Sequence, residues 1–417
     1  MMRRLWWIAP GALVLAWLVM LAPSSAAMAG LLFDAQLLLA WPDTPRGDVA
    51  VVEIDDASVR ALQTQLGPWP YAPATHAALA EFLLELGAKA VVLDVPLTDA
   101  PDGDGALARS LRDTRVVLGV RTSRAAADAT DGATHDALPP LGRTLPAHWP
   151  RTEWPALSAP VATLAALQPP ALGVVATPDG DAHVARWPLM HEVQGRGLPA
   201  LPLAALQAVE PAAPLRFASG AYQLGAHHWP LDAQGRVVLP HVAAQAVPTI
   251  GFLRVGAAAW GITDDPSLRQ AFSGRVVFVG RNVGAAAPRA AATRTQRLAA
   301  ATSALAADQA LHAPSRALDA LLISIALLPA VALWRRGTAD RALDPLLSTG
   351  AAGALLMTST LALAAWRLPS HALPALAVSV AVGLLAWCAA RFAERTRGPH
   401  AAALGATSTR RISRATH

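Results

Sequence analysis

Cysteine and lysine are almost absent from this chain of 417 residues, with Cys388 and Lys89 as their single representatives. One cysteine cannot form an intramolecular disulfide, and it cannot build a cysteine-rich zinc site. The 34 basic residues are therefore almost all arginines, and they are scattered or flank apolar segments. Although the formal net charge is +5, no stripe of arginines with interleaved aromatic residues is present, so we expect no nucleic-acid partner.

The short motifs of common hydrolases and nucleotide-binding proteins are also missing. The sequence contains no G-x-S-x-G, no H-E-x-x-H and no G-x-x-x-x-G-K-[ST]. These patterns mark serine hydrolases, zinc proteases and P-loop proteins respectively. We therefore expect a protein that is not an enzyme and that carries no cofactor and no metal.

Apolar residues are abundant instead, at 53% of the chain, and they concentrate at its two ends. At the N-terminus, an apolar stretch over 5–22 follows two arginines and precedes the small residues "SSAAMAG", so residues 1–30 are either an uncleaved anchor or a signal segment cleaved near 27–29. A bilayer core needs about 20 helical residues. The C-terminal part, over 316–391, accordingly predicts three transmembrane helices, at 318–334, 345–366 and 368–390.

Arginines next to these segments predict their orientation. Three of them lie in the loop 335–341 and three more follow the last apolar segment, whereas the loop between the second and third segments offers only Arg367. By the positive-inside rule, the N-terminus is cytoplasmic and the region from about 40 to 315 is exported. We expect a multi-pass protein of the cell inner membrane.

The exported region alternates short β-branched runs with helical patterns. The strand-like runs cover 48–55, 88–95, 115–120 and 274–280, and helical spacing follows the first at 56–66 and the second at 104–113. Continuous apolar strands alternating with helices predict an α/β domain with a mostly parallel sheet. Farther on, we expect strands on either side of a Pro-Asp-Gly turn within 172–193, a helix over 201–209 and a hairpin over 222–240.

Several stretches of this region, in a fixed order, resemble the CHASE domain of type 2, an extracytoplasmic sensor module of bacterial membrane signalling proteins. They are "FDAQLLLAW", "VAVVEIDDASV", "WPYAPATHA", "GAKAVVLDV", "DGDGALARSL", "GVVATPDGDAHVARWPL", "WPLDAQGRVVLP" and "FSGRVVFVG". The layout of one apolar segment before the domain and three after it is also that of the family. The resemblance implies a sensor domain over 31–315.

The chain departs from the family pattern in two places. Tyr71 and Pro73 stand where relatives tend to have Trp and Arg, and the stretch after Gly280 differs from the usual Asp and Thr-Pro. If these positions contact a ligand in relatives, that contact differs here.

Carboxylates near the expected strand ends are the candidate site residues, because ligands of parallel sheets lie beyond the carboxyl ends of the strands. Asp94 is the first choice for ligand binding, with Asp55 and the Trp69 ring beside it as further candidates. The alternative is structural: Asp55 and Asp56 can cap the following helix, and Asp102 or Asp104 the next one. Asp179 and Asp181 fit a turn better than a calcium loop, and the adjacent His227 and His228 point to opposite faces of a strand.

The function we expect is sensing. A small molecule or an envelope signal binds outside the cytoplasm, and the transmembrane bundle relays the change to a separate partner such as a histidine kinase or nucleotide cyclase; a homodimer is possible. The residues 392–417 are expected to form a short basic cytoplasmic tail without an effector domain. The alternatives are an envelope structural or assembly protein, a remnant that lost its effector and, last, an exported hydrolase.

Overall fold

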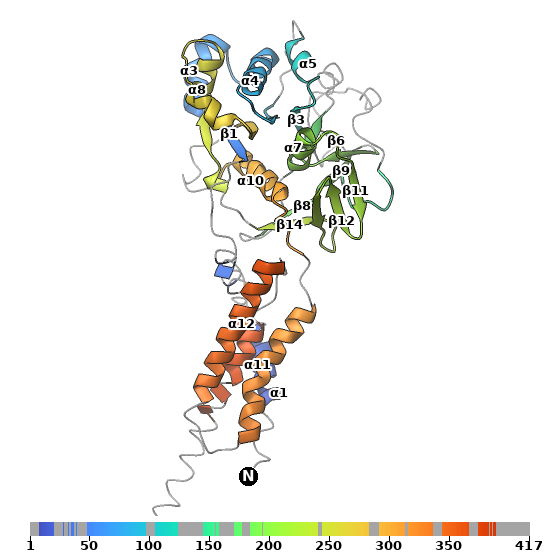
Figure 1. The fold of residues 1–417 in the computed structure, drawn as a ribbon, viewed down its shortest axis with the longest axis vertical. Coiled ribbons are helices and arrows are strands. Elements are labelled where there is room, and N and C mark those ends of the chain that lie inside the picture. Colours follow the sequence, from blue (N-terminus) through green and yellow to red (C-terminus); the bar gives the residue numbers. More distant parts are fainter. Residues whose placement is uncertain are drawn as a thin grey trace, which may run out of the picture. The chain divides into compact units, whose positions relative to one another are not determined.

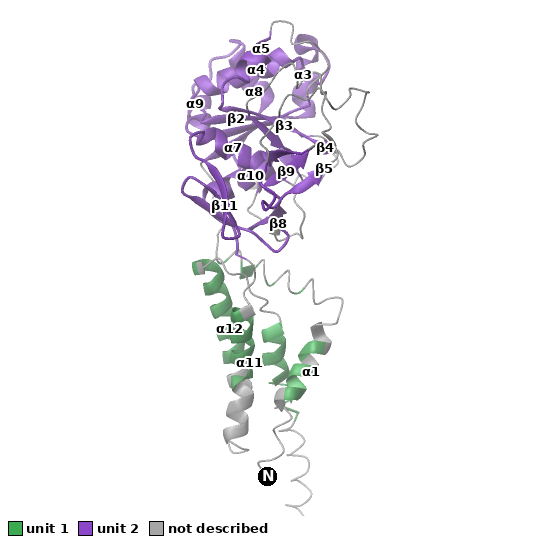
Figure 2. Ribbon diagram, turned by 90° about the vertical axis from the view of Figure 1, so that its right-hand side faces the viewer, with its two compact units in different colours: residues 1–42, 314–417 green, residues 43–313 purple. Residues whose placement is uncertain are grey.

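The computed structural model divides into two compact units, residues 1–42 with 314–417 and residues 43–313 (Figures 1 and 2). The described residues are 8–20, 28, 32, 35–36, 39, 48–96, 105–123, 145–154, 156–157, 171–176, 184–193, 195–240, 244–282, 292–312, 316–336, 344–366, 374–382, 384–385 and 387–388.

A six-stranded parallel sheet forms the centre of the second unit, in the order β15-β1-β16-β2-β3-β7. These strands are β1 (Val49–Ile54), β2 (Ala90–Asp94), β3 (Val116–Val120), β7 (Leu172–Val174), β15 (Thr249–Gly251) and β16 (Val276–Arg281). Residues of β2 and most of β1, β3 and β16 are buried, as the continuous apolar runs predict for strands covered on both faces. The mostly parallel α/β sheet expected from the sequence is therefore confirmed.

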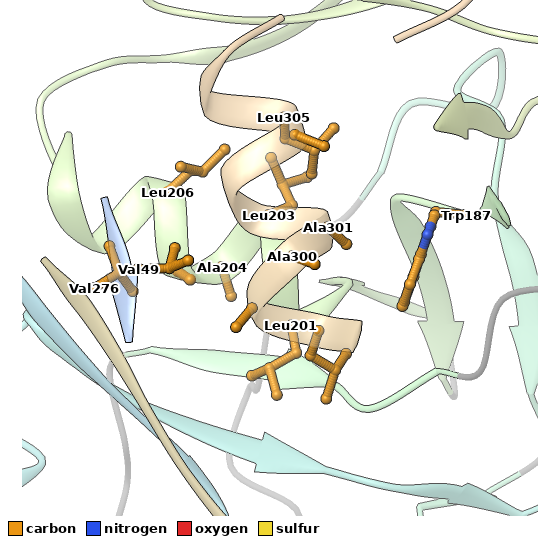
Figure 3. Close-up of a cluster of buried hydrophobic side chains, with 14 of the residues drawn as sticks. Val49, Trp187, Leu201, Leu203, Ala204, Leu206, Val276, Ala300, Ala301 and Leu305 are labelled. Atoms are coloured by element: carbon orange, nitrogen blue, oxygen red, sulfur yellow. The ribbon is translucent and has the colours of Figure 1, made fainter. Parts of the chain in front are cut away.

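Helices cover both faces of this sheet. The apolar cluster of one face contains side chains from α3 (Asp56–Leu66), α4 (Pro73–Glu85), α5 (Ala106–Ser110), α8 (Phe252–Ala259) and α9 (Ser267–Phe272). The cluster of the other face contains those of α7 (Leu201–Val209) and α10 (Arg294–Ala306). Figure 3 shows α10 against α7, with Ala300, Ala301 and Leu305 among the buried side chains.

Smaller sheets accompany the central sheet. They are β8 (Val184–Trp187) with β14 (Val237–Pro240); β5 (Thr152–Trp154), β9 (Met190–Val193) and β10 (Arg196–Pro199); β11 (Leu215–Ala218), β12 (Ala221–Leu224) and β13 (His227–Pro230); and β4 (Thr122–Ser123) with β6 (Ala156–Leu157). Within the hairpin expected over 222–240, β12 pairs with β13, whereas β14 pairs with β8. The strands expected within 172–193 form as β7 and β8, but β7 pairs with β3 and β8 with β14, so they do not pair with each other.

The first unit contains α1 (Ile8–Met20), α11 (Arg316–Arg336), α12 (Asp344–Trp366) and helical residues within 374–388. Small and aliphatic side chains pack between these helices, including Ala12, Ala16, Leu322, Ala326 and Leu355. Within the described part of the chain, no helix reaches both the length and the apolar character required to cross a membrane.

Candidate functional site

Charged and polar residues gather at the carboxyl edge of the parallel sheet. Parallel pairing aligns Gly280 of β16 with Asp94 of β2 on one side, and Arg281 with Ile54 of β1 on the other. The residues that end or directly follow these strands therefore share one edge: Asp55 and Asp56 after β1, Arg281 and Asn282 at β16, Asp94 at β2, and Arg121 after β3.

The chain connections make this edge a place where ligands are usually bound. After β1 and after β2 the chain continues into helices of the first face, α3 and α5, whereas after β16 the next described helix, α10, packs on the opposite face. Where the connections from two neighbouring strands run to opposite faces of the sheet, a crevice opens at the carboxyl ends of those strands. Open α/β sheets usually bind their ligands in this crevice.

Asp94 is buried and tightly paired at this edge. Its carboxylate accepts hydrogen bonds from Arg294 Nε at 3.0 Å, Arg294 Nη2 at 2.9 Å and the Thr295 hydroxyl at 3.3 Å. The side chain of Asp94 is 2% exposed and that of Arg294 is 31% exposed. Burial raises the pKa of the Asp94 carboxyl, while the charges of Arg294 and Arg121 and the hydrogen bonds act in the opposite direction.

Helix α10 begins at this ion pair. Thr293 and Gln296 form a capping box, in which each side chain accepts a hydrogen bond from the other residue's backbone N–H. Gly280 lets the helix approach the strand, because a Cβ atom at this position would lie 2.1 Å from Thr295 Oγ1. The start of α10 is thus fixed to both β2 and β16.

A second cluster surrounds Arg281, the last residue of β16. Its guanidinium lies over the Trp69 ring, with Cζ 5.0 Å from the ring centroid, and Nη2 contacts Asp56 Oδ1 at 3.3 Å. Trp69 in turn meets the rings of Tyr71 and His76 edge-on, at centroid distances of 5.1 and 6.2 Å. The turn before α4 and the first part of α4 therefore bring three aromatic rings together, and one of them, Trp69, lies beside a cation from the sheet edge.

Tyr71 and His76 are buried polar residues without polar partners. Among the described residues, nothing forms a hydrogen bond with the Tyr71 hydroxyl, with either ring nitrogen of His76, or with Arg281 Nε. Tyr71 is 1% and His76 0% exposed. Burial lowers the pKa of His76 to about 4, so the ring is neutral, and burial also raises the pKa of Tyr71. Buried groups of this kind are normally satisfied by a protein, water or ligand partner.

The sequence model of the CHASE2 domain matches residues 12–339 of this chain. The chain belongs to the CHASE2 domain family. The resemblance drawn from the sequence is confirmed, and with it the assignment to a family of extracytoplasmic sensor modules of signalling proteins. No curated protein and no solved structure matches the chain.

The three residues expected to bind a ligand in this CHASE2 domain lie at one sheet edge but in different settings. Asp94 is paired with Arg294. Asp55 caps α3, since its carboxylate accepts a hydrogen bond from Ser58 N at 2.7 Å. Trp69 is half-buried below Arg281. Their roles in ligand binding stay predictions.

Some of the other carboxylates and histidines considered in the sequence lie within the described residues, and some do not. The expected turn residues Asp179 and Asp181 and the possible helix caps Asp102 and Asp104 lie outside the described residues. His227 contacts Asp308 Oδ2 through Nδ1 at 3.1 Å and Glu210 Oε1 through Nε2 at 3.6 Å. Among the described residues, no group of three His, Cys, Asp or Glu side chains could hold a metal ion.

Sequence reasoning missed Arg281, Arg294 and His76 as residues of the CHASE2 site. Arg281 and Arg294 both lie in the stretch after Gly280 where the sequence departs from the family pattern. That departure was a usable signal, but no local pattern shows that Arg294 pairs with Asp94, because the two residues are 200 positions apart.

Proposed function

We propose that this protein is a membrane-bound extracytoplasmic sensor that works by binding instead of catalysis. In this proposal, a signal binds at the carboxyl edge of the parallel sheet and shifts α10, and the C-terminal helices relay the change to a cytoplasmic partner. Membership of the CHASE2 family supports sensing. The observation that carries the relay is α10 itself, which is anchored at both ends.

The first anchor of α10 is the Asp94–Arg294 pair at the sheet edge. The second anchor lies at the other end of the helix. Trp229 Nε1 donates a hydrogen bond to the Leu305 carbonyl at 2.9 Å, and Asp308 Oδ1 accepts one from the backbone N–H of His228 at 3.1 Å. A ligand that favours one arrangement of the first anchor can thereby bias the second, as coupling between two sites requires.

Chain connectivity extends this path. After α10 the backbone of Leu311 bonds to Val238, and the next described helix is α11, which begins at Arg316. Only a few residues thus separate the second anchor from the helices that we propose to be membrane-spanning.

Apolar side chains on the first unit support a membrane location. Among the described residues, the exposed large hydrophobic side chains belong to this unit, apart from Leu253 and Ile262. Trp17 is 63% exposed and Met357 66%. Surfaces of this kind are usually covered by lipid or by another protein, and the arginines of the flanking loops support the cytoplasmic side assigned to them.

Binding without catalysis is supported by the state of Asp94. A general base needs a free carboxylate within reach of a substrate proton. The Asp94 carboxylate already accepts three hydrogen bonds and is 2% exposed. A positioning role for Asp94 at the start of α10 fits this geometry better.

Labelling with a membrane-impermeant maleimide tests the location. In a Cys388→Ser background, Gln65→Cys places a single thiol on the exposed side of α3, and Thr338→Cys places one in the expected cytoplasmic loop. We expect intact spheroplasts to label only the first variant and permeabilised ones to label both. Labelling of Thr338→Cys in intact spheroplasts would overturn the topology.

Sensing is tested with the full chain in lipid nanodiscs. Thermal unfolding is followed against a library of small metabolites and divalent ions, since a compound that binds the native state raises the melting temperature. We expect at least one reproducible shift. A library without any effect argues for a structural role in the envelope instead.

A further inference from the structure

Unsatisfied polar atoms concentrate at one point of the exported domain. Seven buried side-chain nitrogen and oxygen atoms lack a hydrogen-bond partner among the described residues, and four of them belong to Tyr71, His76 and Arg281. The Tyr71 and His76 ring centroids are 6.4 Å apart, and Trp69 contacts both rings and the Arg281 guanidinium. Four unsatisfied polar atoms in one cluster are more than a single imperfect contact would leave. They indicate a binding site for a polar ligand.

The hydrogen-bonding character of these atoms favours a ligand that accepts hydrogen bonds. Arg281 Nε can only donate, the Tyr71 hydroxyl can donate, and the neutral His76 ring carries one donor and one acceptor. Within the described part of the chain, Arg281 has one ionic partner, Asp56, at 3.3 Å through Nη2, and the Asp56 side chain is 47% exposed. A carboxylate group matches the donors, and arginine binds carboxylates with particular strength.

Aromatic rings surround the donors. Trp69 lies below the guanidinium, and Phe252 stacks on Tyr71 with a centroid distance of 5.7 Å and an interplanar angle of 18°. Ligand sites typically combine an apolar or aromatic lining with a few polar groups that fix orientation. The partly exposed Arg281 and Trp69 form the outward side of this cluster, and Tyr71 and His76 its buried side.

We infer that Arg281, Tyr71 and His76 recognise the carboxylate of a small organic acid, and that Trp69 contacts its apolar body. The inference rests on the proposed sensor function, because it gives the chemical class of the signal. In this inference, the ligand carboxylate replaces Asp56 as the ionic partner of Arg281. Arg281 ends β16, and the next described helix in the chain is α10, through which we propose the signal is relayed.

Calorimetric titration of the full chain in nanodiscs tests this site. The probes are acetate and benzoate, with benzamide as a neutral analogue of the same shape and inorganic phosphate as a second anion. We expect the carboxylates to bind, benzoate more tightly than acetate because of its ring, and benzamide and phosphate to give no saturable heat.

Paired variants locate the binding. Arg281→Gln is expected to weaken benzoate binding roughly tenfold or more through loss of a charge-assisted contact. Tyr71→Phe keeps the ring and is expected to weaken it roughly fivefold. The matched controls are Arg236→Gln, whose side chain is 23% exposed and paired with Asp232, and Tyr222→Phe, whose hydroxyl already bonds to the Pro150 carbonyl. Both controls should bind benzoate as the parent does.

Three results would overturn the inference: no saturable heat with either carboxylate, equal binding of benzamide or phosphate, or unchanged benzoate binding in both Arg281→Gln and Tyr71→Phe. Because Tyr71→Phe removes only an unpartnered hydroxyl, misfolding does not obscure the answer. If the carboxylates fail while the metabolite library still yields a shift, the sensor function stands and the carboxylate site falls. If the library also fails and Thr338→Cys labels from outside, the sensor proposal itself is lost.

Discussion

Arg294, the first residue of helix α10, donates two hydrogen bonds to Asp94, which ends strand β2 200 residues earlier in the chain. This contact joins the carboxyl edge of the sheet to α10, the helix that precedes the C-terminal helices α11 and α12 in the chain. It also changes how a substitution of Asp94 is interpreted, because any loss of ligand response in such a variant can come from loosening α10.

Arg294→Gln is expected to destabilise the protein at pH 7 by about 3–5 kcal/mol, because it leaves a buried carboxylate without its cation. Asp94→Asn should cost less, since the Arg294 side chain is 31% exposed and can be hydrated. Urea denaturation of the full chain measures both. As a control, Arg254→Gln breaks the exposed pair with Asp265 and should cost much less, because solvent screens exposed ion pairs. Equal losses in all three variants would contradict the assignment of Asp94 and Arg294 as a structural pair.

Gly280→Ala is expected to push α10 away from β16. The added Cβ would lie 2.1 Å from Thr295 Oγ1 and 2.9 Å from its Cγ2, and overpacking of this kind costs about 1–3 kcal/mol. Gly251→Ala is the matched control, because a Cβ at that strand end meets nothing within 4 Å and its φ is −66°. Thermal melting distinguishes them, and Thr295→Ala should restore part of the loss in the double variant. Comparable melting temperatures for the two alanine variants would be inconsistent with this close approach.

The two tyrosines of the chain should respond oppositely to the loss of their hydroxyls. Tyr222→Phe removes a hydrogen bond to the Pro150 carbonyl and is expected to cost about 1 kcal/mol. Tyr71→Phe removes a buried hydroxyl that has no partner among the described residues, so in ligand-free protein it should be neutral or stabilising. Denaturation midpoints without added carboxylate provide the measurement. A clear loss in Tyr71→Phe would mean that its hydroxyl is already satisfied.

Acid should destabilise the CHASE2 domain through two buried histidines. Burial lowers the pKa of His76 and of His191 to about 4, and Trp154 Nε1 donates to His191 Nδ1 at 3.0 Å, which the protonated ring could not accept. The folded state thus binds fewer protons than the unfolded state, so stability is complete above about pH 6.5 and falls as the pH drops towards 4. Between pH 7.5 and 5 each ring contributes a loss of about 2 kcal/mol.

The matching variant is His191→Asn, which keeps an acceptor near the position of Nδ1 and cannot titrate. Its stability should fall less steeply than that of the parent between pH 7.5 and 5, as followed by denaturation at several pH values. A slope in His191→Asn identical to that of the parent would refute the linkage for this ring.

The sequence determined the fold class of the CHASE2 domain. Runs such as "AVVL" and "VVFV" are apolar at every position, which a strand tolerates only when helices bury both of its faces, so the parallel α/β arrangement followed from local pattern alone. The order of the CHASE2 motifs likewise depends only on sequence. Helices α3 and α7 were predicted at 56–66 and 201–209, where the structure has them, because their boundaries are encoded by neighbouring residues.

Only the tertiary structure decided which elements and residues meet. The insertion of β16 between β1 and β2 and the separation of β7 from β8 into different sheets depend on contacts between distant segments. A buried strand such as β7 can pair within any apolar sheet, so the Pro-Asp-Gly sequence that follows it could not determine its partner. The pairing of Asp94 with Arg294 and the stacking of Arg281 on Trp69 are of the same kind. Single polar residues carry no periodicity, and their partners are chosen by the packing of the whole domain.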